Sequence, residues 1–362
     1  MLHFSNPIEF KGKFLTFILY SICFTILNVA IYNNLCAQKG EIPVVKALDI
    51  KMLPKYTITK LWHEVGTDPF GRPVLVPVLV LKGDGMGPVI GLTAAIHGNE
   101  LNGIPVIQKV ISNIDPKSLK GTIIGIPGIN PESILMNDRR FTDGEDLNRI
   151  FPGKVNGSES EQRVYTILNK LISLMDINID MHTASFGREN CYYARADMKD
   201  DTLAKLAVLQ YADIIVDNVG QPSFGSGSGQ TSRAAAVEKG VKTITVEYGN
   251  PQVYQDDMIK RGIIGVTNAL KWLKMIPGSI ESSKDAVMCA SSFWLYTDTG
   301  GYLEVEVELT QKLTKGQKIA TLRNPFGEIV KEYYSPTDGI VIGKSNNPVA
   351  TQGARIIHIG KY

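Results

Sequence analysis

The fold is decided by residues 89–100, which read VIGLTAAIHGNE. The apolar run 89–96 has the length and composition of a buried strand. His97 and Glu100 follow it directly, and the carboxyl ends of strands are where open α/β sheets place their ligands. Alone this fragment is a weak signal, since a glutamate three positions after a histidine often arises by chance.

A second fragment of the same kind strengthens the signal. Residues 177–181 form another strand-like run, which leads into His182. Asp180 lies two positions before His182 on the same strand face, from where it could orient the imidazole. Two imidazoles and one carboxylate are the ligand set of a catalytic zinc site that keeps its fourth position for water. The two fragments therefore predict one zinc ion bound by His97, Glu100 and His182.

The chain around these fragments alternates between two patterns. Short runs rich in Val and Ile predict strands at 74–81, 89–96, 122–126, 177–181, 214–217 and 243–246. Apolar spacings of three and four predict helices at 104–111, 159–175, 202–209, 233–239 and 256–275. Residues 41–72 are expected to add leading strands. This alternation is typical of an α/β fold with a mixed sheet and helices on both faces, here one domain over residues 38–280.

The pattern changes after Pro277 and Gly278, where strand-like runs with Gly and Pro turns replace helical spacing. Residues 285–362 are expected to form a small all-β domain. Within it, residues 334–341 resemble the half-barrel of biotinyl and lipoyl carrier domains. The Met-Lys attachment signature of those carriers is missing, which favours a structural cap without a carried cofactor.

Composition and the amino terminus limit the class of protein. The 362 residues are 44% hydrophobic and carry a formal charge of +2 without basic blocks, so no nucleic-acid partner is expected. Residues 1–37 place two lysines before a long apolar run and small residues after it, the order of a secretory signal cut near Ala37. An exported, periplasmic protein is predicted, with an uncleaved membrane anchor as the alternative.

The loop 127–159 is long for a compact domain, and such loops are usually functional or disordered. It contains Asn130, then Arg139 and Arg140, and finally Asn148 and Arg149. Arginine side chains hold carboxylates through two parallel hydrogen bonds. Beside the two metal fragments, this content favours a substrate-binding loop.

Four ordered motifs resemble the succinylglutamate desuccinylase and aspartoacylase family, a branch of the zinc carboxypeptidase-like hydrolases. The likeness covers roughly residues 70–360, and the motifs are jointly specific although each alone is weak. They are HGNE at 97–100, DLNR at 146–149 with FPG at 151–153, DMHT at 180–183 and TVEYG at 245–249.

The resemblance implies a role for each matching residue. His97, Glu100 and His182 match the zinc ligands, and Glu247 matches the catalytic carboxylate. Arg140 precedes an aromatic residue, as does the family arginine that polarises the scissile carbonyl, although its spacing to the DLNR motif is slightly loose. Asn148 and Arg149 match the pair that binds a substrate carboxylate.

These residues agree with amide hydrolysis. Zinc gives a nucleophile at neutral pH, Glu247 can move the proton, and fixed positive charge stabilises the carbonyl oxygen. The sequence thus predicts a zinc-dependent deacylase of an N-acyl amino acid or a similar small amide. The alternatives are a carboxypeptidase-like enzyme on peptides or cell-wall peptides, and a non-catalytic metal-binding or ligand-binding module. His63 and His358 are interpreted as structural.

Overall fold

The computed structural model describes residues 41–220, 229–281 and 285–362. Internal contacts divide the chain into two units, Met1–Val44 and Val45–Tyr362. Apart from the short strand β1 (Val44–Val45), every element named below belongs to the second unit. The predicted secretory signal lies outside the described residues. Within those residues, no helix is both long and apolar enough to cross a bilayer.

A mixed sheet forms the centre of the second unit, as predicted. From β2 its strand order is β2-β3-β5-β4-β6-β10-β8-β9-β11. The neighbours of β4 and the β6–β10 pair are parallel, whereas β2, β3 and β8 introduce antiparallel pairs. The strands are β2 (Thr57–Thr67), β3 (Pro73–Lys82), β4 (Val89–Ala94), β5 (Thr122–Ile126), β6 (Ile177–His182), β8 (Tyr192–Ala196), β9 (Ile214–Asp217), β10 (Lys242–Tyr248) and β11 (Val287–Cys289).

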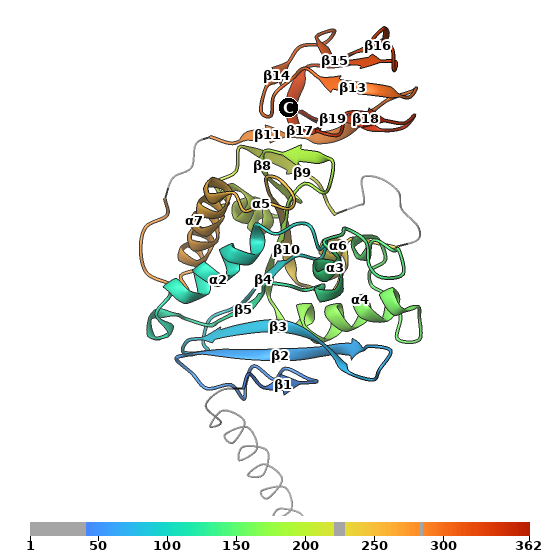
Figure 1. Ribbon diagram of the computed structural model, residues 1–362. Helices are drawn as coiled ribbons and strands as arrows, with labels where there is room; N and C mark the ends of the chain where they lie inside the picture. Colours follow the sequence, from blue (N-terminus) through green and yellow to red (C-terminus); the bar gives the residue numbers. More distant parts are fainter. Residues whose placement is uncertain (1–40, 221–228, 282–284) are drawn as a thin grey trace, which may run out of the picture. The chain divides into compact units, whose positions relative to one another are not determined.

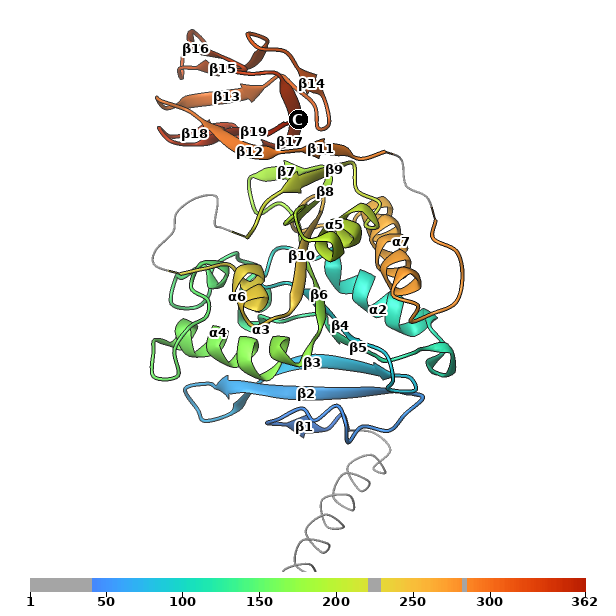
Figure 2. The ribbon, with the colours of Figure 1, turned by 180° about the vertical axis from the view of Figure 1, so that it is seen from behind.

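Helices cover both faces of this sheet, with α2, α5 and α7 on one side and α3, α4 and α6 on the other (Figures 1 and 2). The predicted helices all form, with ends shifted by a few residues. They are α2 (Gly103–Asn113), α4 (Glu159–Lys170), α5 (Asp201–Val208), α6 (Ser232–Glu238) and α7 (Asp256–Trp272), and the loop adds α3 (Pro131–Met136). Single turns occur at η1 (Pro116–Ser118), η2 (Leu147–Arg149) and η3 (Ile172–Leu174).

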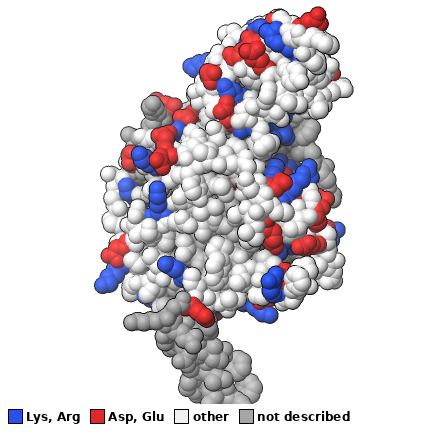
Figure 3. Space-filling model, viewed as in Figure 1, with Lys and Arg blue, Asp and Glu red and all other residues white. Residues whose placement is uncertain are grey.

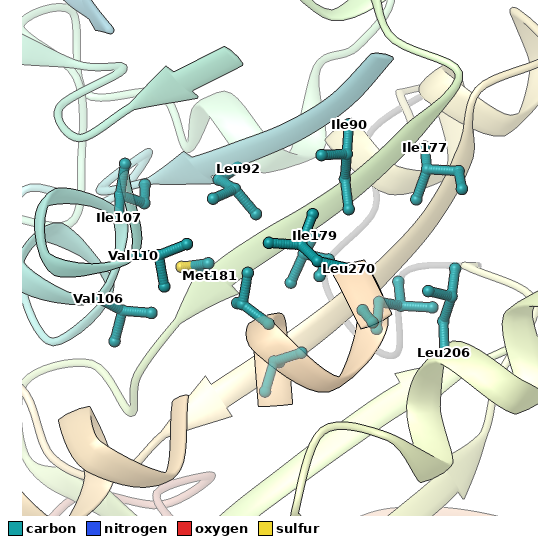
Figure 4. Close-up of a cluster of buried hydrophobic side chains, with 14 of the residues drawn as sticks. Ile90, Leu92, Val106, Ile107, Val110, Ile177, Ile179, Met181, Leu206 and Leu270 are labelled. Atoms are coloured by element: carbon teal, nitrogen blue, oxygen red, sulfur yellow. The ribbon is translucent and has the colours of Figure 1, made fainter. Parts of the chain in front are cut away.

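The core on the α2 side follows from the helical spacing of apolar residues on α2 and from the alternation of side chains along the strands. Val106 and Val110 recur at helical spacing on α2, while Leu92 and Met181 come from neighbouring strands, and these side chains pack together (Figure 4). β4 lies between two parallel strands and is buried along nearly its whole length, which explains its continuous apolar sequence. The opposite faces of β4, β6 and β10 remain available for polar side chains.

The all-β part forms two further sheets. One has the order β12-β19-β17-β14, and the other β16-β15-β13-β18. Their strands are β12 (Ser291–Tyr296), β13 (Gly301–Val305), β14 (Lys312–Leu313), β15 (Lys318–Arg323), β16 (Ile329–Tyr334), β17 (Gly339–Ser345), β18 (Val349–Ala350) and β19 (Arg355–Lys361). β11 still pairs with β9 of the large sheet, so the chain changes sheet between Cys289 and Ser291.

A short strand that the sequence did not predict joins the two parts of the second unit, the α/β part with the large sheet and the C-terminal all-β part. β7 (Arg188–Asn190) comes from the loop after β6 and pairs with β17 of the C-terminal sheet. The two parts therefore share backbone hydrogen bonds close to the chain segment that follows His182.

On the face shown in Figure 3, acidic and basic side chains are interspersed around a wide uncharged area.

Candidate active site

The three predicted metal ligands lie together. His97 and Glu100 follow β4, and His182 ends the adjacent parallel strand β6. Their potential ligand atoms all lie within 4.8 Å of one another, and the residues are only 2%, 2% and 4% exposed. The parallel register brings the two strand ends to the same edge of the sheet, which is why distant fragments meet.

The orientation of the two imidazoles fits a metal. Nε2 of His97 lies 3.0 Å from Oδ1 of Asp146, and Nε2 of His182 lies 3.1 Å from Oδ2 of Asp180. Because carboxylates accept hydrogen bonds, each Nε2–H donates and a neutral ring turns its Nδ1 lone pair the other way. Both Nδ1 atoms face Glu100, at 2.9 Å from its two oxygens. Two lone pairs and a carboxylate converge there, a donor set that suits zinc.

The carboxylate behind His182 is itself held in place. Oδ1 of Asp180 accepts a hydrogen bond from Thr93 at 2.8 Å, and Oδ2 accepts one from Ser232 at 3.2 Å. The contact expected between Asp180 and His182 is thus present, on the face of β6 opposite the apolar core. Such outer partners fix the ring orientation of a ligating histidine.

The site keeps Glu100 ionised. Burial opposes the charge, but the imidazoles of His97 and His182, in their protonated form, outweigh it and hold the pKa of this carboxyl well below its usual range. Ser185 donates a hydrogen bond to Oε1, and the backbone N–H of Thr183 donates to Oε2 at 3.3 Å. An anionic Glu100 is the form that a metal ion requires.

Glu247 is on β10, in register with His182 of β6. It lies beside the ligand cluster, which consists of His97, Glu100 and His182. Asn190 of β7 donates a hydrogen bond to its Oε2 at 3.2 Å. Burial raises the pKa of Glu247 and the negative charge of Glu100 adds to that rise, although the guanidinium groups of Arg195 and Arg139 act against it. A carboxylate with a raised pKa is suited to accepting and returning a proton near neutral pH.

The structure brings Arg139, not Arg140, to the ligand cluster. Nη1 of Arg139 donates to Oε1 of Glu100 at 3.0 Å, and Nη2 donates to Oδ2 of Asp146 at 2.8 Å. Arg140 is exposed, and its Nη1 donates to the carbonyl oxygen of Gly144 at 2.6 Å. The choice between two consecutive arginines depends on the direction of each side chain in the loop, which the sequence motif did not specify.

Asn148 and Arg149 line the cavity that contains His97, Glu100 and His182. Oδ1 of Asn148 accepts a hydrogen bond from the backbone N–H of Ser232 at 2.7 Å, which places the start of α6 beside η2. Nη1 of Arg149 donates to the carbonyl oxygen of Asn148 at 2.8 Å, and the side chain is only half-buried. Part of its guanidinium fork therefore remains open to a ligand.

The cavity has a volume of about 800 Å³ and includes residues from both parts of the second unit. Volumes of this order are typical of small-molecule sites. Sequence reasoning missed several of its members because they depend on long-range packing: Ser185, Arg188, Asn190, Arg195, Trp294 and Arg355. For Asp146 the DLNR motif itself was the available signal, since it supplies a carboxylate that can orient a histidine.

The chain is similar in sequence to known proteins. The family model described as succinylglutamate desuccinylase/aspartoacylase catalytic domain matches residues 86–273. The chain is 25% identical over 278 residues to the N-alpha-acetyl-L-2,4-diaminobutyric acid deacetylase of Halomonas elongata, covering 75% of this chain and 81% of that protein.

Solved structures share the fold over nearly their whole length. The succinylglutamate desuccinylase/aspartoacylase from Rhodobacter sphaeroides has a TM-score of 0.76 at 20% identity, covering 88% of this chain and 99% of that one. The product-bound ectoine utilization protein EutE (DoeB) from Ruegeria pomeroyi has a TM-score of 0.75 at 20% identity, with 84% and 95% covered. With the family model matching more than half of its length, the chain belongs to the succinylglutamate desuccinylase/aspartoacylase family.

Proposed function

We propose that this protein is a zinc-dependent deacylase that hydrolyses the amide bond of an N-acyl amino acid or a similar small amide with a carboxylate. The observation that carries the proposal is the convergence of both Nδ1 atoms on Glu100, with Glu247 alongside. Membership of a family of deacylases supports the same reaction class.

His97, Glu100 and His182 would hold the metal ion. When bound, zinc supplies a Lewis acid and a water that is acidic enough to react at neutral pH. Asp146 and Asp180 keep the two imidazoles in the tautomer that leaves Nδ1 free for the metal.

Glu247 is the group that moves the proton in this proposal. Its carboxylate takes a proton from the attacking water and returns it to the leaving nitrogen, while Asn190 fixes one of its oxygens. Arg139 takes the role first predicted for Arg140, because its guanidinium lies at the ligand cluster. There it can stabilise negative charge that develops on the carbonyl oxygen.

Asn148 and Arg149 would orient the substrate through its carboxylate. The half-buried guanidinium of Arg149 can bind a carboxylate through two parallel hydrogen bonds, which a lysine cannot do. Holding the substrate at this end keeps its amide close to Glu247.

The test is a panel of amides incubated with the zinc-loaded protein. It contains N-acetyl and longer N-acyl amino acids, including N-alpha-acetyl-2,4-diaminobutyrate because of the relative's name, together with dipeptides and cell-wall peptides. Hydrolysis of at least one N-acyl amino acid is expected. Cleavage of peptides alone would favour the carboxypeptidase-like alternative, and zinc binding without hydrolysis of any amide would favour the non-catalytic module.

A further inference from the structure

A buried charge lies on α4, outside the active-site cavity. Arg163 is only 4% exposed, although its guanidinium stays charged at every physiological pH. A buried charge is unfavourable unless fixed partners compensate it, so its partners indicate which parts of the fold it holds together. Here they come from α3 and from the loop 137–146, which carries Arg139.

The first partner is a carboxylate of α3. Nη1 of Arg163 donates to Oε2 of Glu132 at 2.6 Å, and this largely buried, charge-assisted pair ties α4 to α3. The next residue of α3, Ser133, contacts the loop twice. Its Oγ donates to the carbonyl oxygen of Arg140 at 3.0 Å, and its carbonyl oxygen accepts from the backbone N–H of Asp138 at 3.1 Å. α3 therefore holds this part of the loop.

The second partner is an aromatic ring of the loop itself. The guanidinium carbon of Arg163 lies 5.2 Å from the ring centroid of Phe141, which is almost fully buried. Contacts of this kind hold a guanidinium plane and a ring in a fixed arrangement. The backbone N–H of Ser160, also on α4, donates to Oδ2 of Asp143 at 3.3 Å. α4 therefore holds the part of the loop that follows Arg140.

The same loop brings Arg139 to the ligand cluster. Arg139 precedes Phe141 by two residues, and its guanidinium donates to Glu100 at 3.0 Å and to Asp146 at 2.8 Å. The backbone N–H of Phe141 donates to the carbonyl oxygen of Glu145 at 2.8 Å, directly before Asp146. Both sides of the contact between Arg139 and Asp146 thus depend on the position of Phe141.

We propose that Arg163 is a positioning residue for Arg139. By joining α3, α4 and the ring of Phe141, it sets the position from which the Arg139 guanidinium stabilises the carbonyl oxygen of the substrate. Arg163 does not line the active-site cavity and acts only through the loop. This inference rests on the proposed deacylase function and deepens it. The effect is large because a misplacement of about 1 Å at a reacting centre can cost about 10²-fold in rate.

Kinetics of the zinc-loaded protein give the first test. Arg163→Met removes both contacts and keeps an unbranched side chain that suits a helix. It should lower kcat about 10- to 100-fold with KM changed by less than about threefold, because the loss concerns the transition state and not substrate binding. Zinc content should not change. Arg163→Lys should lose less, since it keeps the charge beside Glu132 but has no planar face for Phe141.

A double-mutant cycle separates positioning from a purely structural role. In an Arg139→Met background, Arg163→Met should lower kcat by less than about a further threefold, because the group that it positions is already gone.

Arg261→Met is the matched control. Arg261 of α7 also pairs with a carboxylate, that of Asp213 at 2.8 Å, and lies over an aromatic ring, that of Tyr192 at 4.4 Å. It belongs to the opposite face of the sheet from α4 (Figures 1 and 2). The control should lose stability and keep kcat within about threefold of the wild type.

A crystal structure of zinc-loaded Arg163→Met protein gives a readout that needs no hydrolysis. The Arg139 guanidinium should move by about 1 Å or more and lose its hydrogen bond to Glu100. If Arg163→Met does not fold, Arg163→Lys and Phe141→Leu are measured in the same ways. Phe141→Leu keeps an apolar side chain but removes the ring face, so it should show the same displacement and the same loss of kcat.

Four results would overturn the positioning role. They are a kcat within about threefold of the wild type, an equal loss of kcat in Arg261→Met, a full further loss in the Arg139→Met background, and an unmoved Arg139 in the crystal structure. If the protein hydrolyses no amide, the proposed function fails, and the position of Arg139 in the variant still decides this inference. Hydrolysis that Arg163→Met leaves unchanged would preserve the function and refute the positioning role.

Discussion

Glu247 lies beside the potential metal ligands but is not one of them, so a substitution there tests proton transfer separately from metal binding. Glu247→Gln should retain one zinc per chain while kcat falls by about 10² to 10⁴, the usual range for a general acid-base group. Elemental analysis and steady-state kinetics measure the two effects. Glu145→Gln, which changes an exposed carboxylate at the same cavity, is the matched control and should remain near the wild type. Near-normal turnover in Glu247→Gln would refute the role.

The consecutive arginines make a second prediction at the residue scale. Arg139→Met should lower kcat by about 10² to 10³, the loss typical for one donor that stabilises developing charge. Arg140→Met should change kcat by less than about threefold, since its side chain is exposed and its guanidinium donates a hydrogen bond to the carbonyl oxygen of Gly144 instead of to Glu100. Kinetics on both variants with zinc contents matched decides between them. A larger loss for Arg140→Met would restore the original sequence-based assignment.

At the scale of elements, the β7–β17 pair connects the C-terminal sheet to Glu247 through Asn190. Gly343 lies opposite Asn190 in this pair, and a Cβ atom there would lie 2.3 Å from Oδ1 of Asn190. Gly343→Ala should therefore displace the amide that bonds Glu247 and lower kcat while zinc content is unchanged. Gly66→Ala is the control, because its Cβ would meet only the Arg163 side chain at an ordinary 3.5 Å. Equal activity of the two variants would contradict this connection.

The elements also show what the sequence could predict. β4 and β6 were predicted with their ligands because each is an apolar run that leads directly to a histidine. β7 was not, since its three residues are polar and pair with a strand far along the chain. The role at the scissile carbonyl was assigned to Arg140 and not to Arg139 for a different reason. The side chains of neighbouring loop residues point in different directions, and a sequence motif gives only the order of the residues. Arg355 and Trp294 line the cavity because the sheets pack together, and no local sequence pattern indicates that packing.

For the whole molecule, the amino-terminal prediction concerns residues outside the described ranges. Protein recovered from its native host should begin at or near Gln38, because a charged region, an apolar run and small residues occur in that order before it. Amino-terminal sequencing or intact mass measures this. A membrane-bound chain that retains residues 1–37 would establish the anchor alternative.

The measurement that tests the central claim most directly is the metal content of the purified protein. Elemental analysis should find about one zinc per chain in the wild type and in Glu247→Gln. It should find almost none in His182→Ala, which removes one of three convergent ligands from a buried cluster. Full zinc occupancy in His182→Ala, or a wild type that binds no zinc when it is supplied, would contradict the account.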